Sequence, residues 1–345
     1  MSGYAIIGCG HVAERHVQAA IDLPNTRVAV LCDADEEVAK ELAAKHELEC
    51  LVTTDYREAL DRGDVHIAVI ALPTFLHCEA CLAAAEAGKH VYVEKPIAQT
   101  LEEGWEMIAA CKQAGVKMVV GHSHRYFPVL QRARELVQEG AIGKLLKIRS
   151  VLCSYKDFSA EERAWHLDAS HDLHGPLLDV GVHVADDIHF LADSYTIRLC
   201  AEGGCMRPEE TELIDSGIAV LRLANGVIAE WEVSETQTTG GKFPCQNSTE
   251  IYGTKGALMI NGSNLSVFIH GHGDNPGEFR EEKHPATPFY SSWLHLHRDF
   301  VASIKQDTPV PVPPLASYRA LQVVGAIFTS IRENCAVEIP EADEQ

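Results

Sequence analysis

Lys95 follows a short strand at a position where an α/β sheet can bind ligands. The strand Val91-Tyr92-Val93 is apolar, β-branched and aromatic, as expected of an inner strand buried on both faces. Pro96 ends the strand, because proline has no N–H to donate to the ladder. A lysine at the carboxyl end of such a strand lies at the rim where open α/β sheets bind ligands. The alternative is an ordinary exposed lysine, so the neighbouring motifs must decide.

A glycine turn, Gly8-Cys9-Gly10-His11-Val12-Ala13, follows the first predicted strand and opens a helix. This G-x-G-x-x-A pattern is a variant of the dinucleotide-binding fingerprint: Gly8 makes the tight turn, and Gly10 lets the backbone approach a pyrophosphate. The helix starting near His11 turns its N–H groups toward that negative charge. Asp33 ends the second strand at the spacing that the fingerprint requires, where it can accept hydrogen bonds from ribose hydroxyls. The same carboxylate repels a 2′-phosphate and therefore favours NAD over NADP.

A second set of reactive side chains lies on a helix that opens with a Gly-Pro pair. Asp179 and His183 are four residues apart, so they share one face of that helix. Asp186 lies three residues further on the same side, and Asp186 or Asp187 can orient the His183 imidazole from behind. Such a pair is by itself more often a structural hydrogen bond. Together with the strand-end lysine and the glycine turn, it becomes a candidate acid–base centre.

Single helices separate the predicted strands up to residue 121, which implies βαβ crossovers and a parallel, doubly wound sheet. The predicted strands cover residues 4–7, 27–31, 50–53, 66–72, 90–93 and 116–120. The predicted helices cover residues 11–22, 35–46, 56–61, 75–87 and 101–114. The fourth strand ends in Leu72-Pro73-Thr74, a loop that should border the middle of a dinucleotide. His77, one turn into the next helix, either joins that loop at the cofactor or bonds to the backbone.

The pattern changes after residue 121 to long strands followed by two helices. The predicted strands cover residues 144–155, 195–200, 214–223, 227–233, 249–260 and 265–270. The predicted helices cover residues 128–139, 293–305 and 314–334, besides the one that opens at residue 175. We expect loops at 238–246 and 271–284 because both are rich in Gly and Pro. The polar segment 156–174 contains Trp165-His166, and this tryptophan either stacks on a sugar face or is a satellite core residue.

Several ordered motifs resemble those of the Gfo/Idh/MocA oxidoreductases, and the similarity covers nearly the whole chain. Besides the glycine turn they are Pro73-Thr74-Phe75-Leu76-His77, Ala87-Gly88-Lys89-His90-Val91, Glu94-Lys95-Pro96, the segment 121–128 and the D-x-G-x-H-x-x-D at 179–186. The resemblance implies an α/β Rossmann domain at residues 1–121. It also implies an α+β domain at 122–345 with a large, mostly antiparallel open sheet, whose terminal helix can pack back on the first domain. That sheet usually forms the oligomer interface, so a homodimer or homotetramer is expected.

The resemblance also implies site residues. The expected catalytic residues are Lys95, Asp179 and His183. The expected cofactor-binding residues are Gly8, Gly10, His11, Val12, Asp33, Pro73, Thr74, His77, Glu94 and Lys95. The expected substrate-binding residues are Lys95, Arg125, Trp165, His166, Asp179 and His183. Ser123, His124 and His166 depart from the family pattern near the expected substrate pocket, so they bear on substrate identity more than on chemistry.

The composition of the chain excludes several classes of partner. A formal charge of −21 over 345 residues argues against a nucleic-acid or anionic membrane surface. No apolar run reaches membrane-spanning length, and the first residues enter a strand directly, which predicts no signal peptide. Eleven cysteines without framework spacing predict reduced thiols in a cytoplasmic protein. None of the histidines has a metal-ligand spacing, so no metal is expected.

These features together predict an NAD-dependent oxidoreductase that acts on a secondary hydroxyl of a sugar, cyclitol or polyol. His183 would take the hydroxyl proton, Lys95 would hold the substrate oxygen, and Asp179 would bind a neighbouring hydroxyl or balance the charge. Two alternatives remain. One is an NAD-dependent glycosidase on the same scaffold, and the other is a non-catalytic NAD-binding regulatory protein.

Overall fold

The computed structural model describes residues 2–155, 175–209, 211–236, 247–271, 276–285 and 289–342. The chain forms two compact units. The first consists of Met1–Ser123 and Pro288–Tyr318, and the second of His124–Thr287 and Arg319–Gln345. The segment with Trp165 and His166 and the loop predicted at 238–246 lie outside the described residues.

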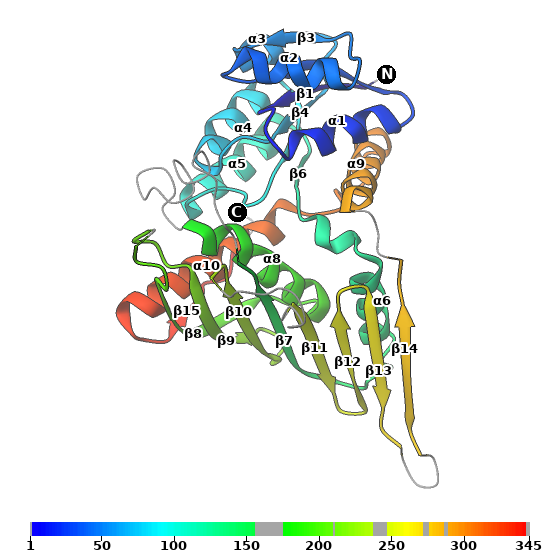
Figure 1. Cartoon of the computed structure of the whole chain (residues 1–345), viewed down its shortest axis with the longest axis vertical. Helices are drawn as coiled ribbons and strands as arrows, with labels where there is room; N and C mark the ends of the chain where they lie inside the picture. The colour runs from blue at the N-terminus through cyan, green and yellow to red at the C-terminus, as the bar shows by residue number, and fades with distance from the viewer. Residues whose placement is uncertain are drawn as a thin grey trace. The chain divides into compact units, whose positions relative to one another are not determined.

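The first unit is built on a six-stranded parallel sheet with the order β3-β2-β1-β4-β5-β6 (Figure 1). Its strands are β1 (Ser2–Ile7), β2 (Thr26–Cys32), β3 (Leu51–Thr53), β4 (Ile67–Ile70), β5 (His90–Val93) and β6 (Met118–Val120). Its helices are α1 (Ala13–Asp22), α2 (Glu36–Lys45), α3 (Tyr56–Leu60), η1 (Thr74–Leu76), α4 (His77–Glu86), α5 (Leu101–Ala114) and α9 (Phe289–Gln306). The strand order reverses between β1 and β4. Open sheets of this kind bind ligands beyond the carboxyl ends of the strands at such a point.

Local signals explain why these elements begin and end where they do. The strands β4, β5 and β6 are almost wholly buried, because helices cover both faces of a parallel sheet. Helix α5 starts with a capping box, in which Thr100 and Glu103 satisfy each other's backbone N–H groups. It ends at Gly115, which adopts the left-handed conformation that favours glycine. These signals fix the chain on either side of Lys95.

The second unit contains a nine-stranded sheet with the order β14-β13-β12-β11-β7-β10-β9-β8-β15. The strands are β7 (Leu145–Cys153), β8 (Thr196–Gly204), β9 (Ser216–Leu223), β10 (Ile228–Ser234), β11 (Ser248–Gly253), β12 (Gly256–Asn261), β13 (Asn264–Ile269), β14 (Glu278–Lys283) and β15 (Val337–Glu338). Neighbouring strands are antiparallel except for the parallel pair β7–β10. Its helical elements are η2 (Ser123–Tyr126, whose first residue is assigned to the first unit), α6 (Pro128–Gln138), α8 (Gly175–Ala192) and most of α10 (Pro314–Glu333).

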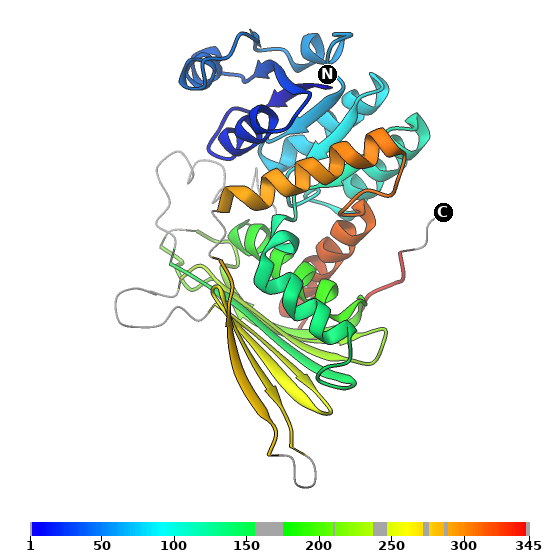
Figure 2. The ribbon, with the colours of Figure 1, turned by 90° about the vertical axis from the view of Figure 1, so that its right-hand side faces the viewer.

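Helix α8 is fixed on the sheet by a close contact with β10. It packs on β7 and β10, and α6 packs on β12 and β13, so both helices lie on the same face of the sheet (Figure 2). Trp231 on β10 is fully buried, and its indole N–H donates to the carbonyl oxygen of Gly181 at 3.0 Å. A side chain at Gly181 would place its Cβ 2.7 Å from the indole ring. Only glycine permits this approach, which holds the part of α8 that carries Asp179 and His183.

The predicted fold class is confirmed, and three features of the second unit correct the sequence prediction. The single strand predicted at 249–260 is a hairpin, β11 and β12. A Cβ at Gly253 would lie 2.2 Å from a carbonyl of Ile142, and one at Gly256 would lie 2.2 Å from a carbonyl of Phe268. The loop predicted at 271–284 contains the charged edge strand β14, and β15 was not predicted. No helix among the described residues is long and apolar enough to cross a membrane.

Candidate active site

Gly8 makes the turn after β1 that the sequence predicts. Its φ is +91°, and a Cβ there would lie 2.4 Å from the carbonyl oxygen of Ala71. The backbone N–H of Gly8 donates to the carbonyl of Cys32 at 2.8 Å, which ties the turn to the end of β2. Backbone conformation and space therefore both require glycine at this position.

Gly10 lies over open space, as a pyrophosphate-binding turn needs. No heavy atom outside its chain neighbours lies within 4 Å of the position that a Cβ would take, and Gly10 and His11 are exposed. Helix α1 begins three residues later with Val12 at its N-cap, and no side chain caps it. The first turn of an uncapped helix presents N–H groups to an anion. The geometry fits the phosphates of a dinucleotide.

Asp33 links the glycine turn to the end of β2. Its Oδ2 accepts the backbone N–H of Cys9 at 2.7 Å, and its Oδ1 accepts that of Asp35 at 3.0 Å. A carboxylate oxygen can accept two hydrogen bonds, so each oxygen keeps capacity for a hydroxyl donor. The side chain is partly exposed. Its position fits the predicted role toward the ribose of NAD, and the glycine turn and Asp33 together form one candidate cofactor site.

His77 bonds to the backbone, which was one of the two alternatives for it. The side chain is 1% exposed, with Nδ1 2.9 Å from the carbonyl oxygen of Pro96 and Nε2 2.9 Å from that of Leu72. Burial lowers the pKa of His77, and the carbonyl oxygens of Leu72 and Pro96 oppose this shift. The neutral imidazole has a single N–H and donates to one of the two carbonyls at a time. The side chain thus joins the end of β4 to the loop after β5. Pro73, Thr74 and η1 lie between these anchors, and their contact with a cofactor stays a prediction.

Lys95 lies two residues beyond β5, whose observed bounds equal the predicted ones, and it is half-buried. Its backbone N–H donates to Oε2 of Glu94 at 3.3 Å. Glu94 was predicted as a cofactor-binding residue, which stays a prediction, and its carboxylate points into a buried cluster with His16 and Trp293. Sequence reasoning missed these two residues. The available signal was a histidine on the buried face of α1, directly after a dinucleotide turn.

In the second unit, His183 lies against an aromatic neighbour. Asp179 and His183 are both half-buried on α8. The His124 ring stacks on the His183 ring, with centroids 4.1 Å apart and an interplanar angle of 14°. Nδ1 of His124 lies 3.2 Å from Oδ2 of Asp187. His124, one of the residues that depart from the family pattern, thus lies between Asp187 and His183, and the predicted orientation of His183 by Asp186 or Asp187 stays a prediction.

Arg125 forms a bidentate ion pair with Asp186. Its Nε donates to Oδ2 at 2.8 Å and its Nη2 to Oδ1 at 2.6 Å, and Asp186 is 1% exposed. The guanidinium also lies over the Phe190 ring. The ion pair fastens η2 to α8, and the predicted contact of Arg125 with substrate stays a prediction. The substrate roles of Trp165 and His166 stay predictions.

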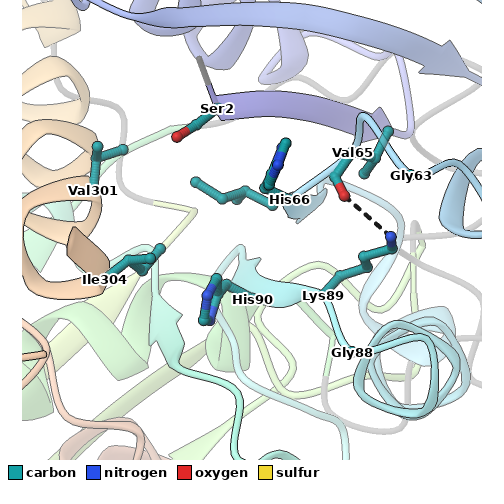
Figure 3. Close-up of a pocket in the computed structure, with 10 residues that line it drawn as sticks. Ser2, Gly63, Val65, His66, Gly88, Lys89, His90, Val301 and Ile304 are labelled. Atoms are coloured by element: carbon teal, nitrogen blue, oxygen red, sulfur yellow. Dashed lines mark hydrogen bonds between the residues drawn. The ribbon is translucent and has the colours of Figure 1, made fainter.

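Two cavities lie within single units. A cavity of about 240 Å³ in the second unit is lined by His124 and Asp187 together with the polar side chains Ser150, Asn247 and Thr249. A cavity of about 290 Å³ in the first unit is lined by His66, Lys89 and His90 (Figure 3). His66 and His90 lie at the amino ends of β4 and β5, so this second cavity is at the sheet edge opposite Lys95.

Two family models match the chain. The model of the oxidoreductase family with an NAD-binding Rossmann fold (GFO_IDH_MocA) matches residues 2–122. The model of the GFO/IDH/MocA C-terminal domain matches residues 130–259. Both units therefore contain matched residues.

Three named relatives have known activities. Levoglucosan dehydrogenase from Pseudarthrobacter phenanthrenivorans is 30% identical over 256 residues, which are 67% of this chain and 64% of the relative. The 1,5-anhydro-D-fructose reductase from Ensifer adhaerens is 28% identical over 259 residues, 75% of each chain. The 2,7-anhydro-N-acetylneuraminate hydratase from Escherichia coli is 33% identical over 146 residues, 42% of this chain and 38% of the relative.

A solved structure resembles the whole chain. Levoglucosan dehydrogenase in complex with NADH and levoglucosan superposes with a TM-score of 0.87 and 26% identity, covering 99% of this chain and 100% of that one. The similarity thus extends over both units.

Proposed function

The chain belongs to the Gfo/Idh/MocA oxidoreductase family, and we propose that it transfers hydride between NAD and a secondary hydroxyl or ketone of a sugar or related polyol. One observation carries the proposal. At the carboxyl ends of the strands of the first sheet, an open glycine turn and the Asp33 carboxylate suit a dinucleotide, and Lys95 lies two residues beyond the end of β5 in the same sheet.

The reaction needs a base and a group that stabilises negative charge. The nicotinamide ring, when bound, supplies the hydride acceptor. An alcohol does not ionise near neutral pH, so a base must take the hydroxyl proton as the hydride leaves. His183 has this role, because imidazole exchanges protons near neutral pH. Lys95 holds the substrate oxygen and stabilises developing alkoxide charge, and Asp179 binds a neighbouring hydroxyl or balances the positive charge.

The names of the relatives narrow the choice of substrates. One is named for levoglucosan, and two are named for anhydro derivatives of fructose and N-acetylneuraminate. We therefore place anhydro sugars first in a substrate screen, ahead of inositols, sugar acids and open sugars. The second-unit cavity beside His124 and Asp187 offers the polar side chains that such hydroxyl-rich ligands need.

The test is a thermal-shift screen of these compounds with NADH present, followed by absorbance of NADH during turnover. We expect one compound class to raise the melting temperature and to give net NADH formation or consumption. Asp33→Ser should narrow the preference for NAD over NADP by about 10-fold or more, since it removes the charge that repels a 2′-phosphate. Wild-type preference for NADPH, or NADH binding without turnover on any sugar, would contradict the proposal; the latter is the result expected of a non-catalytic regulatory protein.

A second candidate function has one observation in its favour. The hydratase relative supports an NAD-dependent glycosidase-type reaction, in which transient oxidation allows elimination of a leaving group. Such an enzyme would give no net NADH and would release the leaving group from a nitrophenyl glycoside. Net NADH formation with a sugar alcohol group would decide for the dehydrogenase.

The proposed enzyme is a homo-oligomer that associates through the outer face of the nine-stranded sheet. Strand register places Ile218 opposite Glu232 and Val220 opposite Glu230, so these side chains share one face. Ile218 and Val220 are 50% and 56% exposed. The other exposed apolar residues that register places on this face are Ile228, Tyr252, Met259, Phe268 and Phe279. Exposed apolar side chains gathered on one sheet face, here interleaved with the charged Glu230 and Glu232, mark an interaction surface.

Light scattering on the purified protein tests the oligomer. We expect a dimer or tetramer in wild type and a shift to monomer in Val220→Lys. A monomeric wild type at micromolar concentration would contradict it.

We also propose a cytoplasmic location, because free thiols are typical of proteins in a reducing compartment. The ten cysteines among the described residues are free, and the nearest pair, Cys81 and Cys111, has sulfurs 3.7 Å apart. A disulfide needs about 2.05 Å. Thiol titration of protein purified without reductant should count all eleven cysteines of the sequence as reactive after unfolding.

A further inference from the structure

The carboxylate of Glu94, the residue before Lys95, is buried in a fixed geometry. The residue is 5% exposed, and a Cβ at Gly121 would lie 2.7 Å from its Oε1. Burial alone would raise the pKa of this carboxyl group. The hydrogen bond and charge of His16, the charge of Lys95 and the indole of Trp293 outweigh burial, and the pKa of Glu94 is lowered. The group is therefore a buried anion at neutral pH.

Donors from three elements surround this anion. The indole N–H of Trp293, on α9, donates to Oε1 at 3.1 Å. Nε2 of His16, on α1, lies 3.1 Å from the same oxygen. The backbone N–H of Lys95 donates to Oε2. One oxygen thus faces two helices, and the other faces the residue that we assign to the chemistry.

The His16 imidazole is itself held from behind. Its Nδ1 lies 2.8 Å from Nε2 of His297, and both histidines are fully buried. His297 stacks on Tyr92 of β5 with centroids 4.3 Å apart. Burial lowers the pKa of His297, and the charge of His16 lowers it further, so its ring stays neutral. Packing on β5 and α9 leaves the His16 ring one orientation.

We propose, resting on the proposed function, that His16 and Trp293 are positioning residues for Lys95, acting through Glu94. Each holds Oε1 of the carboxylate, and Oε2 in turn holds the backbone N–H of Lys95. If one donor is lost, the buried carboxylate must turn toward another partner, and the backbone of Lys95 loses its anchor. Misplacement of a reacting group by about 1 Å can lower turnover by about 10²-fold.

The first experiment measures kcat, sugar KM and NADH affinity for three variants. His16→Leu should lower kcat by about 10–100-fold with KM and NADH affinity changed less than about 3-fold, because only the reacting group moves. His16→Gln keeps an N–H donor and should recover most of that loss. Val17→Ala is the matched control: it opens a cavity at the next buried residue of the same helix and removes no hydrogen-bond donor. Equal losses of kcat in Val17→Ala and His16→Leu, or no recovery in His16→Gln, would overturn the proposal.

A double-mutant cycle tests whether His16 acts through Glu94. On a Glu94→Gln background, His16→Leu should lower kcat by less than about 3-fold, because the carboxylate that it holds is already gone. Trp293→Phe gives a second cycle should His16→Leu fail to fold, with Trp105→Phe as its control, since Trp105 packs against Tyr318 away from Glu94. Full retention of the single-variant effect on the Glu94→Gln background would overturn the proposal.

A measurement without substrate separates this inference from the proposed function. The rate of amine labelling at Lys95 is followed by peptide mass spectrometry, with Lys89 as internal reference, because Lys89 is held by the carbonyls of Arg62 and Val65. His16→Leu should raise the Lys95 to Lys89 ratio about 3-fold or more, and His16→Gln should not. An unchanged ratio would overturn the positioning role even if wild type turns over sugar. A changed ratio in a protein without sugar turnover would remove only the proposed function.

Discussion

Glu94 in the first unit is buried and Asp187 in the second is half-buried, with 15% of its side chain exposed; each lies beside a histidine, yet their pKa values move in opposite directions. Burial raises the pKa of Asp187, and neither the charge of His124 nor its hydrogen bond reverses this. The pKa of Glu94 is lowered, although burial acts on it in the same sense. The histidine alone therefore does not decide the charge of a buried carboxylate.

The number of donors explains the difference. Glu94 faces the indole of Trp293, His16 and the backbone N–H of Lys95, whereas the one hydrogen bond that Asp187 makes within the described part of the chain goes to His124. Hydrogen bonds to the charged form favour it, and burial without them disfavours it. The nearby charge of Asp186 adds to the effect on Asp187. The first unit thus holds a fixed anion behind Lys95, and the second holds a carboxyl group with a raised pKa one turn from His183 on the same helix.

The largest expected effect tests the catalytic role of Lys95, the residue that follows the fixed anion Glu94. Lys95→Ala should lower turnover by about 10²–10⁴, the range for losing one charge-stabilising group, while NADH affinity stays within a few-fold. Steady-state kinetics and NADH fluorescence titration measure the two quantities. Lys89→Ala, at the opposite edge of the sheet, is the control and should leave both near wild type. Unchanged turnover in Lys95→Ala would remove this lysine from the mechanism.

His189 sharpens the comparison, because it is a buried base: burial lowers its pKa, so its pH effect has the same sign as that of Glu94 and the opposite sign to that of Asp187. Burial lowers the pKa of His189 to about 4, the charge of Asp186 opposes this, and Arg125 and Arg319 add to it. The unfolded chain binds a proton below about pH 6.5 that the folded chain does not, so stability falls as pH drops from 6.5 toward 4. The loss at pH 4.5 should be about 2–3 kcal/mol.

Urea unfolding of wild type and His189→Gln between pH 7 and pH 4.5 measures this loss of stability. The two stability curves should converge, or cross, as pH falls, because the variant lacks the titrating group. Parallel curves would show that His189 does not carry the pH dependence.

The sequence predicts elements that local signals define. The strand His90–Val93 and the helix Leu101–Ala114 match their predicted bounds. Residues next to these elements set the bounds: Pro96 follows the strand, the capping box at Thr100 starts the helix, and Gly115 ends it. The hairpin β11–β12 was missed because close contacts with distant backbone determine the position of its turn, at Gly253 and Gly256. Strand β14 was missed because its residues are charged, and it forms a strand only by pairing with β13.

The same limit applies to the site. The glycine turn, Asp33 and Lys95 are readable from short motifs with a known mechanism. The residues that hold Glu94 cannot be predicted in this way, since His16 contacts His297 across 281 positions of sequence and Trp293 contacts Glu94 across 199. The pairing of Asp187 with His124 also joins residues that no periodicity connects. Tertiary packing sets these contacts, so only the structure reveals them.

Glu94→Gln should destabilise the first unit by about 1–3 kcal/mol at pH 7, because the amide nitrogen is a donor that faces other donors in a buried site. The sign of the pH dependence follows from the lowered pKa. The stabilisation from the Glu94 anion is fully present above the ordinary value of 4.5 and is lost as pH falls below it through the folded pKa. Urea unfolding at pH 7 and at acid pH should therefore show the gap between wild type and variant shrinking at acid pH. A gap that does not change with pH would mean that Glu94 stabilises by packing alone.

Asp187→Asn should have the smallest effect, and at pH 7 the opposite sign. A carboxyl group whose pKa is raised on folding costs stability once pH exceeds its ordinary value of 3.8, and the cost grows until pH passes the folded pKa. Asparagine keeps an oxygen for His124 and carries no charge that burial would disfavour. We expect the variant to equal or exceed wild type by less than about 1 kcal/mol at pH 7 and to lose that advantage toward pH 4. A loss at pH 7 as large as that of Glu94→Gln would mean that Asp187 is as well satisfied as Glu94, and the difference between the two units would then not lie in their donors.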